Sequence, residues 1–175
     1  MKRGRVRIAV DRAFSRAFAR LPLLGRLWAR AASLRTSAGI IPWTPFATPL
    51  AACRATLITT GGVHLAHEAP FDMRAPHGDP TFREIPSNAA PADLRITHDY
   101  YDHRDADRDV NLVFPLERFR ELVERHALAG LTPHHWSFMG HIDGPLVQTL
   151  ETVSIPALLQ RLHGDQPDFV LLVPA

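Results

Sequence analysis

Two short apolar segments constrain the fold of this chain more than any other feature of its sequence. Residues 55–60 read Ala-Thr-Leu-Ile-Thr-Thr, and residues 169–173 read Phe-Val-Leu-Leu-Val. Neither segment alternates between apolar and charged residues, as a strand with one solvated face would. Strands that carry no charge along their length are typical of a parallel sheet, which helices bury on both faces. The sequence therefore predicts an α/β fold.

The remaining elements alternate along the chain in the way that such a fold requires. Pro115 suits the first turn of a helix that ends just before Gly130, and Asp143 is a suitable N-cap for a second helix that begins near Pro145. The predicted elements are strands at 55–60, 94–97, 135–139 and 168–173, helices at 115–129 and 145–162, and an irregular segment at 63–92. We predict an open, mostly parallel sheet with flanking helices, Rossmann-like or flavodoxin-like.

The N-terminal segment differs in charge from the rest of the chain. Residues 1–35 hold ten of the twenty Lys and Arg residues and one acid, Asp11, whereas the remainder is net acidic. Apolar residues recur there at steps of three and four, which predicts a basic amphipathic helical arm ahead of a single α/β domain at 36–175. The arm either docks on its own domain, which we favour, or contacts an acidic partner, anionic lipid or nucleic acid.

Cysteine content and hydropathy restrict the cellular setting. Cys53 is the single cysteine, which excludes a disulfide framework and a Cys-x-x-Cys redox pair within this sequence. No apolar run is long enough to span a membrane, and the charged start lacks the unbroken apolar core of a secretory signal. We therefore expect a cytoplasmic protein without a membrane span.

The stretch from His98 to Asn111 follows a predicted strand and contains two histidines and five aspartates. In open α/β sheets, ligands bind beyond the carboxyl ends of the strands. Three loops should meet at that edge: residues 61–72, 98–111 and 140–143. We therefore predict that the polar stretch borders a functional site rather than an unstructured surface.

Three residues of these loops are candidates for catalysis: His64, His98 and Asp102. An imidazole can transfer protons near neutral pH, and a carboxylate can hold an ammonium group. The same side chains could instead bind a divalent metal, zinc or iron, although their spacing lacks a diagnostic pattern such as His-Glu-x-x-His. A third interpretation is structural, with His98 and Asp102 holding the loop together by hydrogen bonds.

Five further residues are candidates for substrate binding: Arg83, Asp109, Asn111, Ser137 and Gly140. Arg83 could pair with a substrate carboxylate through two hydrogen bonds, or form a structural salt bridge with Asp79. Asp109 and Asn111 lie farther along the loop of His98. Ser137 and Gly140 lie between a strand and a helix, where backbone N–H groups can bind an anion.

Several motifs together resemble a known family. They are TLITTGGVHLAHEAPFD (56–72), GDPTFREIP (78–86), DLRITHDYYD (93–102), DRDVNLVFPLERFRELV (107–123), SFMG (137–140) and DFVLLVPA (168–175). In style and order they resemble the selenoprotein B family of glycine, sarcosine, betaine and D-proline reductases. The resemblance runs from about Pro45 to the last residue and leaves out the basic arm.

The resemblance implies an oxidoreductase that cleaves the carbon–nitrogen bond of a small amino-acid-like substrate. Such proteins use a cysteine or selenocysteine nucleophile and a dithiol reductant, together with other subunits. In the family the nucleophile follows a strand that resembles VLLVPA, and this sequence ends at Ala175, where that motif is expected to begin. We therefore expect another protein subunit to supply the thiol or selenol.

Three functions remain open from the sequence. The chain is a component of such a reductase, a metal-dependent enzyme that uses His64, His98 and Asp102, or a non-catalytic binding or scaffold subunit whose basic arm grips an acidic partner. Self-association into a homo-oligomer is compatible with each of them.

Overall fold

The computed structural model describes residues 43–175, together with the single positions Val10, Ala13, Arg26 and Arg30. The basic helix predicted at 1–35 therefore lies, apart from those four positions, outside the described residues. No helix in the described part is both long and apolar enough to cross a membrane.

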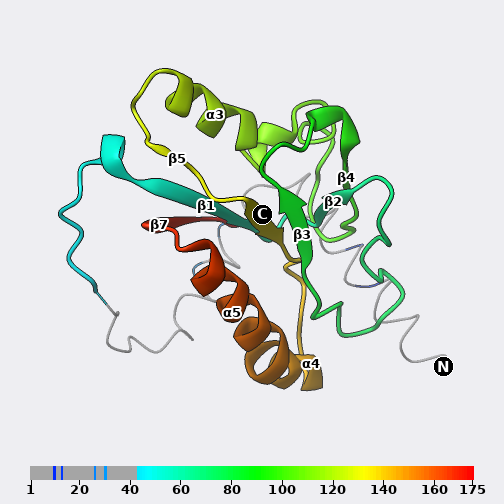
Figure 1. Cartoon of the computed structure of the whole chain (residues 1–175). Coiled ribbons are helices and arrows are strands. Elements are labelled where there is room, and N and C mark those ends of the chain that lie inside the picture. Colours follow the sequence, from blue (N-terminus) through cyan, green and yellow to red (C-terminus); the bar gives the residue numbers. More distant parts are fainter. Residues whose placement is uncertain (1–9, 11–12, 14–25, 27–29, 31–42) are drawn as a thin grey trace.

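The main sheet is built around β1 (Arg54–Thr59), which is parallel to β5 (Gly130–Leu131), β6 (His134–Ser137) and β7 (Phe169–Val173). Ala55 pairs with both Leu131 and Phe169, and Ile58 pairs with both Trp136 and Leu172. β5 and β6 therefore follow one another along one edge of β1, and β7 lies along the other (Figure 1). The prediction of an α/β fold with a mostly parallel sheet is confirmed.

Helices cover both faces of this sheet. α3 (Leu116–Glu124) lies on one side of β1, and the helical segment of α4 (Pro145–Thr149), a π-helical turn (Leu150–Ser154) and α5 (Ile155–Asp165) lies on the other (Figure 1). Leu57 packs with the cluster that contains Phe114 and Leu116, whereas Ile58 packs with Trp136, Leu158 and Leu162. Successive residues of β1 thus face opposite helices, and β1 is the buried strand that its sequence predicts.

Strand predictions for the middle of the chain were partly wrong. Residues 63–92, predicted to be irregular, contain β2 (Val63–Leu65) and β3 (Arg83–Pro86). β3 is antiparallel to β6, so the sheet is mixed. β4 (Leu94–Ile96), expected in the main sheet, pairs antiparallel with β2 in a separate two-stranded sheet. Strands of three or four residues are too short to show a hydrophobic period.

β7 differs from its prediction in burial. It was expected to be buried on both faces, but among the described strands it pairs only with β1 and forms an edge of the sheet. Leu172 is 68% exposed, and the other four residues of the strand are partly buried. The apolar sequence identified the strand correctly and placed it wrongly within the sheet.

Two helix boundaries also differ from the prediction. α3 ends at Glu124, just before His126, whose φ is 56°, and Gly130 belongs to β5 rather than to a helix end. Asp143 is not the N-cap of α4: Gly144 is, and the carboxylate of Asp143 bonds to His77 instead. α5 continues through His163 and Gly164 to Asp165, where Gln166 ends it in a left-handed conformation.

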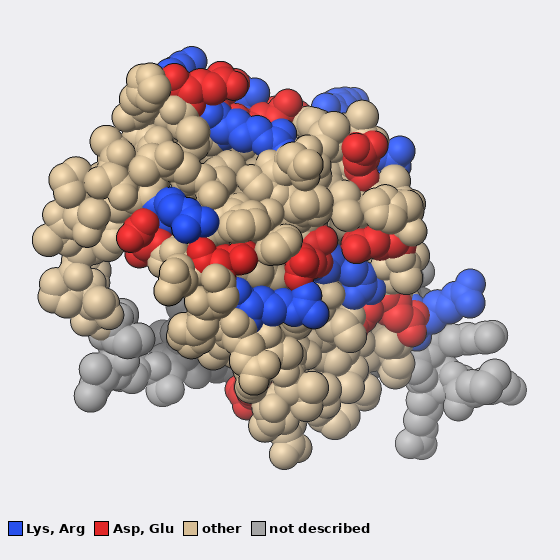
Figure 2. All heavy atoms as spheres, in the orientation of Figure 1, with Lys and Arg blue, Asp and Glu red and all other residues tan. Residues whose placement is uncertain are grey.

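Single 3₁₀ turns complete the described chain, at Leu50–Ala52, Pro91–Asp93 and Val110–Leu112. Figure 2 shows acidic and basic side chains intermixed over the upper and middle part of the visible face, with few charges over α4 and α5. Apolar residues of this helical segment are partly exposed there, among them Val153 and Leu159.

Candidate active site at the carboxyl edge of the sheet

The carboxyl ends of β1, β6 and β7 meet at one edge of the main sheet. The backbone N–H of Thr60 donates to the carbonyl of Val173 (3.1 Å), and that of Phe138 donates to the carbonyl of Thr59 (2.9 Å). The hydroxyl of Thr60 accepts a hydrogen bond from the N–H of Ala175 at 3.0 Å. The segments after these three strands are therefore held against one another.

Gly140 shows how closely these segments approach. Its φ is +75°, and a Cβ added there would lie 2.8 Å from the carbonyl oxygen of Thr60. Glycine is required because the loop after β6 lies directly on the end of β1. Ser137, the last residue of β6, is fully buried, and its hydroxyl lies 3.4 Å from the carbonyl oxygen of Phe138.

The loop that begins at His98 is fastened to the same edge. The hydroxyl of Tyr101 donates to the carbonyl of Gly61 (3.0 Å), and the ring of Tyr100 stacks on His141 with 3.8 Å between centroids. Burial raises the pKa of Tyr101 to about 12, so this phenol keeps its proton. All three loops expected at the edge do meet there.

His98 is buried at this edge, with 5% of its surface exposed. Its Nδ1 accepts the N–H of Tyr100 at 3.1 Å, and its ring lies 4.6 Å from that of Tyr101, centroid to centroid. Burial lowers the pKa of His98 to about 4, so the imidazole is neutral at neutral pH. The Nδ1 lone pair of this neutral ring is already engaged with the N–H of Tyr100, and the ring also hydrogen-bonds the backbone of Met139.

His64 lies in β2 and is equally buried. Its Nδ1 lies 2.9 Å from the carbonyl oxygen of Leu65, and its Nε2 lies 2.8 Å from the hydroxyl of Thr97, the residue before His98. A Cβ on Gly62 would lie 3.2 Å from the Cβ of His98. The small sheet of β2 and β4 therefore brings His64 and His98 into neighbouring positions, with both nitrogens of His64 engaged.

Asp102 is partly exposed and paired with Arg104. The two guanidinium nitrogens Nε and Nη2 of Arg104 donate to its carboxylate at 2.8 and 2.6 Å. Hydrogen bonds from Arg104 lower the pKa of Asp102 to about 2. The carboxylate is ionised at neutral pH, and its partner is this arginine rather than His98.

Arg83 lies beside Ser137 in the pairing of β3 with β6. Its guanidinium donates to the carbonyls of Ala69 (2.9 Å) and Pro70 (3.1 Å), and lies 3.6 Å from the carboxylate of Asp79. These contacts anchor the segment before β3. They include the salt bridge with Asp79 that the sequence suggested as the alternative to substrate binding.

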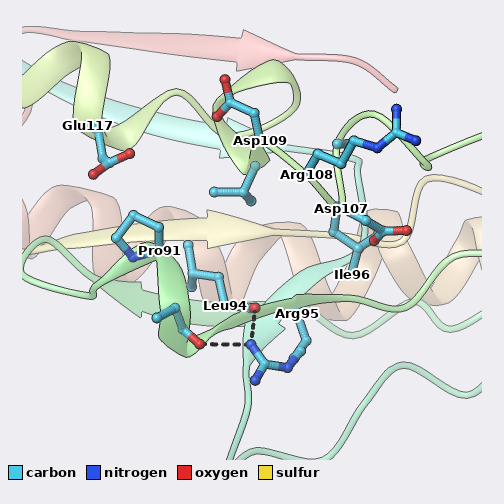
Figure 3. Close-up of a pocket in the computed structure, with 11 residues that line it drawn as sticks. Pro91, Leu94, Arg95, Ile96, Asp107, Arg108, Asp109 and Glu117 are labelled. Carbon is cyan, nitrogen blue, oxygen red and sulfur yellow. Dashed lines mark hydrogen bonds between the residues drawn. The ribbon is translucent and has the colours of Figure 1, made fainter.

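Asp109 lines a pocket of about 510 Å³ between β4 and the start of α3, and Asn111 lies beside it (Figure 3). The amide of Asn111 donates to Asp109 and to Glu117, both at 2.9 Å, and so holds two carboxylates at this pocket. In Figure 3, Leu94 lies between Asp109 and Arg95. The Nη1 of Arg95 donates to the carbonyls of Ala92 and Leu94. None of the histidines of the carboxyl edge lines this pocket.

Sequence reasoning missed four side chains at the carboxyl edge: His77, Tyr100, His141 and Asp143. The Nδ1 of His77 lies 2.6 Å from Oδ1 of Asp143. A usable signal was present, because His77 and Asp143 each precede a glycine, which permits close backbone approach.

No cluster of three or more His, Cys, Asp or Glu side chains suited to a metal ion occurs within the described part of the chain. Metal binding by His64, His98 and Asp102 stays a prediction.

Cys53 is fully buried at the start of β1, and its thiol lies 3.2 Å from the carbonyl oxygen of Pro49. Burial raises the pKa of this thiol, and the thiolate is the reactive form. We predict that 5,5′-dithiobis-nitrobenzoate labels Cys53 at least about a hundredfold more slowly in the native protein than in urea. Equal rates in the two states would show that the thiol is accessible in the folded chain.

Comparisons with known proteins agree with the motif resemblance in its broad form. The D-proline reductase subunit gamma of Acetoanaerobium sticklandii is 31% identical to this chain over 130 residues. Those residues make up 74% of this chain and 52% of the relative, so the chain spans about half the length of the curated relative that it matches. No family model matches the sequence, and no solved structure matches the fold. The similarity relates this chain, in the broad sense, to the reductases that include D-proline reductase.

Proposed function

We propose that the chain is a cytoplasmic component of a glycine, sarcosine, betaine or D-proline reductase of the selenoprotein B type. It acts on a small amino-acid-like substrate, together with another subunit that supplies the thiol or selenol. The observation that carries this proposal is the 31% identity to a D-proline reductase subunit over 74% of the chain.

The placement of Cys53 supports an external nucleophile. This residue is the single cysteine of the sequence, and its buried thiol lies at the amino end of β1, whereas His98 and His141 lie near the carboxyl ends of the strands. A thiol supplied from elsewhere would reach His98 at the edge where ligands bind in open α/β sheets.

Within this proposal, His98 is a catalytic candidate because its ring borders the edge, and a proton transfer there would have to replace its hydrogen bond to the N–H of Tyr100. His64 and Asp102 would act by holding the two segments that flank it, through Thr97 and Arg104. Ser137 and Gly140 would shape the substrate site at the end of β6. Arg83, Asp109 and Asn111 would bind a substrate only if it extends beyond this edge.

The isolated chain should show no dithiol-dependent cleavage of glycine, sarcosine, betaine or D-proline, because its single thiol is buried. Adding a thiol- or selenol-bearing reductase subunit from the same organism should produce turnover that depends on both proteins. Release of ammonia or an amine measures turnover of glycine, sarcosine and betaine, and formation of the ring-opened amino acid measures turnover of D-proline, whose nitrogen stays in the product. Cys53→Ala is a control that should behave like the natural chain. Turnover by the isolated chain would refute the external nucleophile, and no turnover with any substrate in the mixture would refute the reductase assignment.

A further inference from the structure

A cavity of about 380 Å³ lies between the start of β3 and the π-helical turn that leads into α5. Arg83, which lines the cavity, pairs with Ser137, the last residue of β6, so the cavity borders the carboxyl edge of the main sheet. Pockets that hold small molecules have volumes of roughly 300–1,000 Å³. The cavity is therefore large enough for a small ligand.

One wall of the cavity comes from the π-helical turn at Leu150–Ser154. The N–H of Ile155 donates to the carbonyl five residues earlier, and Pro156, which follows it, has no N–H to continue an α-helical pattern. Turns of this kind are rare, and they occur frequently at functional sites. Val153 and Ser154 belong to the turn and line the cavity.

Glu68 also lines the cavity, and one oxygen of its carboxylate lacks a donor. Its Oε2 is shielded from water and has no hydrogen-bond partner within the described chain. The residue is held in place, because its N–H donates to the carbonyl of Leu65 at 3.0 Å and Arg83 bonds to the carbonyls of the next two residues. A shielded carboxylate oxygen without a donor is unfavourable, and a bound ligand can supply the donor.

The other charged groups of the cavity are already paired. Arg161 donates a hydrogen bond to the carboxylate of Glu84. The guanidinium of Arg83 lies 3.6 Å from the carboxylate of Asp79, and its N–H groups bond to carbonyls. Among the described residues that line the cavity, Glu68 is therefore the charged side chain without an ionic partner, so the cavity suits a cation.

We propose that this cavity binds a small organic ammonium ion with a primary or secondary nitrogen, whose N–H donates to the carboxylate of Glu68. A charge-assisted hydrogen bond supplies both the missing donor and the missing counter-ion. The last torsion of a glutamate side chain is broad, so rotation about it turns Oε2 toward the ligand. The carbon atoms of the ligand pack on the apolar residues of the lining, Phe82, Val153 and Ala157. The proposal stands on the cavity and does not rest on the proposed function.

Titration of the isolated, ¹⁵N-labelled chain with pyrrolidinium chloride at constant ionic strength tests the site. Amide resonances of residues 81–84 and 153–155 should shift and saturate. N,N-Dimethylpyrrolidinium has the same ring and charge but no N–H, and it should bind at least about tenfold more weakly. The proposal fails if these resonances show no saturable shift up to about 100 mM pyrrolidinium, or if the two cations bind equally well.

Two variants of the isolated chain test the lining. Glu68→Gln keeps the size of the side chain and should weaken pyrrolidinium binding at least about tenfold. Ala157→Leu keeps the carboxylate but should abolish binding by filling the cavity, and leucine is a good helix former. Natural affinity in either variant, with native circular dichroism, would overturn the proposal.

Glu124→Gln is the matched control for the loss of charge. Glu124 is exposed at the end of α3, on the other side of the sheet from α5 (Figure 1). This variant has the same net charge as Glu68→Gln, so its affinity for pyrrolidinium should equal that of the natural chain. An equal loss of affinity in the two variants would show that the cation responds to net charge alone, and would overturn the assigned site.

Discussion

The protein should lose roughly 3 kcal/mol of folding free energy for each of two buried histidines, His98 and His135, as the pH falls from about 6.5 to about 4. Burial lowers the pKa of both imidazoles from 6.5 to about 4. Between those values the unfolded chain binds a proton at each histidine and the folded chain does not. Above pH 6.5 the burial of these neutral histidines therefore does not lower the free energy of unfolding, and below pH 6.5 that free energy falls as the pH falls.

His135 shows the structural cause most clearly. It is fully buried in β6, its Nδ1 accepts the N–H of Leu57 at 3.1 Å, and its Nε2 has no hydrogen-bond partner in the described structure. Protonation of Nδ1 would remove the acceptor for Leu57 and place a charge in the core. Arg120 adds a smaller repulsion. Asp102, with its pKa at about 2, contributes to acid sensitivity only at lower pH.

Urea unfolding at about pH 7 and about pH 4.5 measures this loss. The variant His135→Asn keeps an acceptor for Leu57 through its side-chain oxygen but cannot titrate, so the difference in stability between the two pH values should shrink by about half. His67→Asn, at an exposed position, is the matched control and should leave the difference unchanged. If the stability of His135→Asn depended on pH in the same way as that of the natural chain, the loss of stability at acid pH would not come from His135.

Replacing Gly78 by alanine should destabilise the protein by about 3–5 kcal/mol, the range of severe backbone and steric defects. Its φ of +89° disfavours any side chain, and the new Cβ would lie 1.8 Å from the carbonyl oxygen of His141. The obstacle is backbone, so no side-chain rotation relieves it. The loops that carry His77 and Asp143 would have to separate.

Gly164→Ala is the matched control for this substitution. Gly164 lies within α5, and no atom lies within 4 Å of the position that its Cβ would take. Alanine should stabilise the helix there by about 0.5–1 kcal/mol. Chemical denaturation of both variants checks the pair, and a Gly78→Ala protein of natural stability would mean that the two loops do not approach as closely as described.

The sequence predicted those parts of the fold that depend on local pattern. Continuous apolar runs identified β1 and β7, and Pro115 marked the start of α3. The convergence of the loops after β1 and β6 followed from the general position of ligand sites in α/β sheets. The loop of His98 follows β4, which lies outside the main sheet, and it reaches this edge through the contacts of Tyr100 and Tyr101 instead.

Local sequence patterns could not predict contacts between segments that are distant in the chain. Asp143 has the sequence signature of an N-cap, yet its carboxylate bonds to His77, 66 residues away. The apolar residues of β7 do not reveal that the strand lies at an edge. The hydrogen bonds of His64 and His98 to Leu65, Thr97 and Tyr100 depend on a small sheet whose three-residue strands carry no periodic signal, and a site shared by these two histidines stays a prediction.

The pairing of β1 with β7 also sets the order in which this protein can assemble. Arg54 and Asp168, at the starts of the two strands, are 114 residues apart in the chain and joined by a hydrogen bond. On the ribosome, Arg54 is added 114 residues before Asp168, so this edge of β1 has no partner strand until β7 is synthesised. During that interval the edge is available to a chaperone or to another chain.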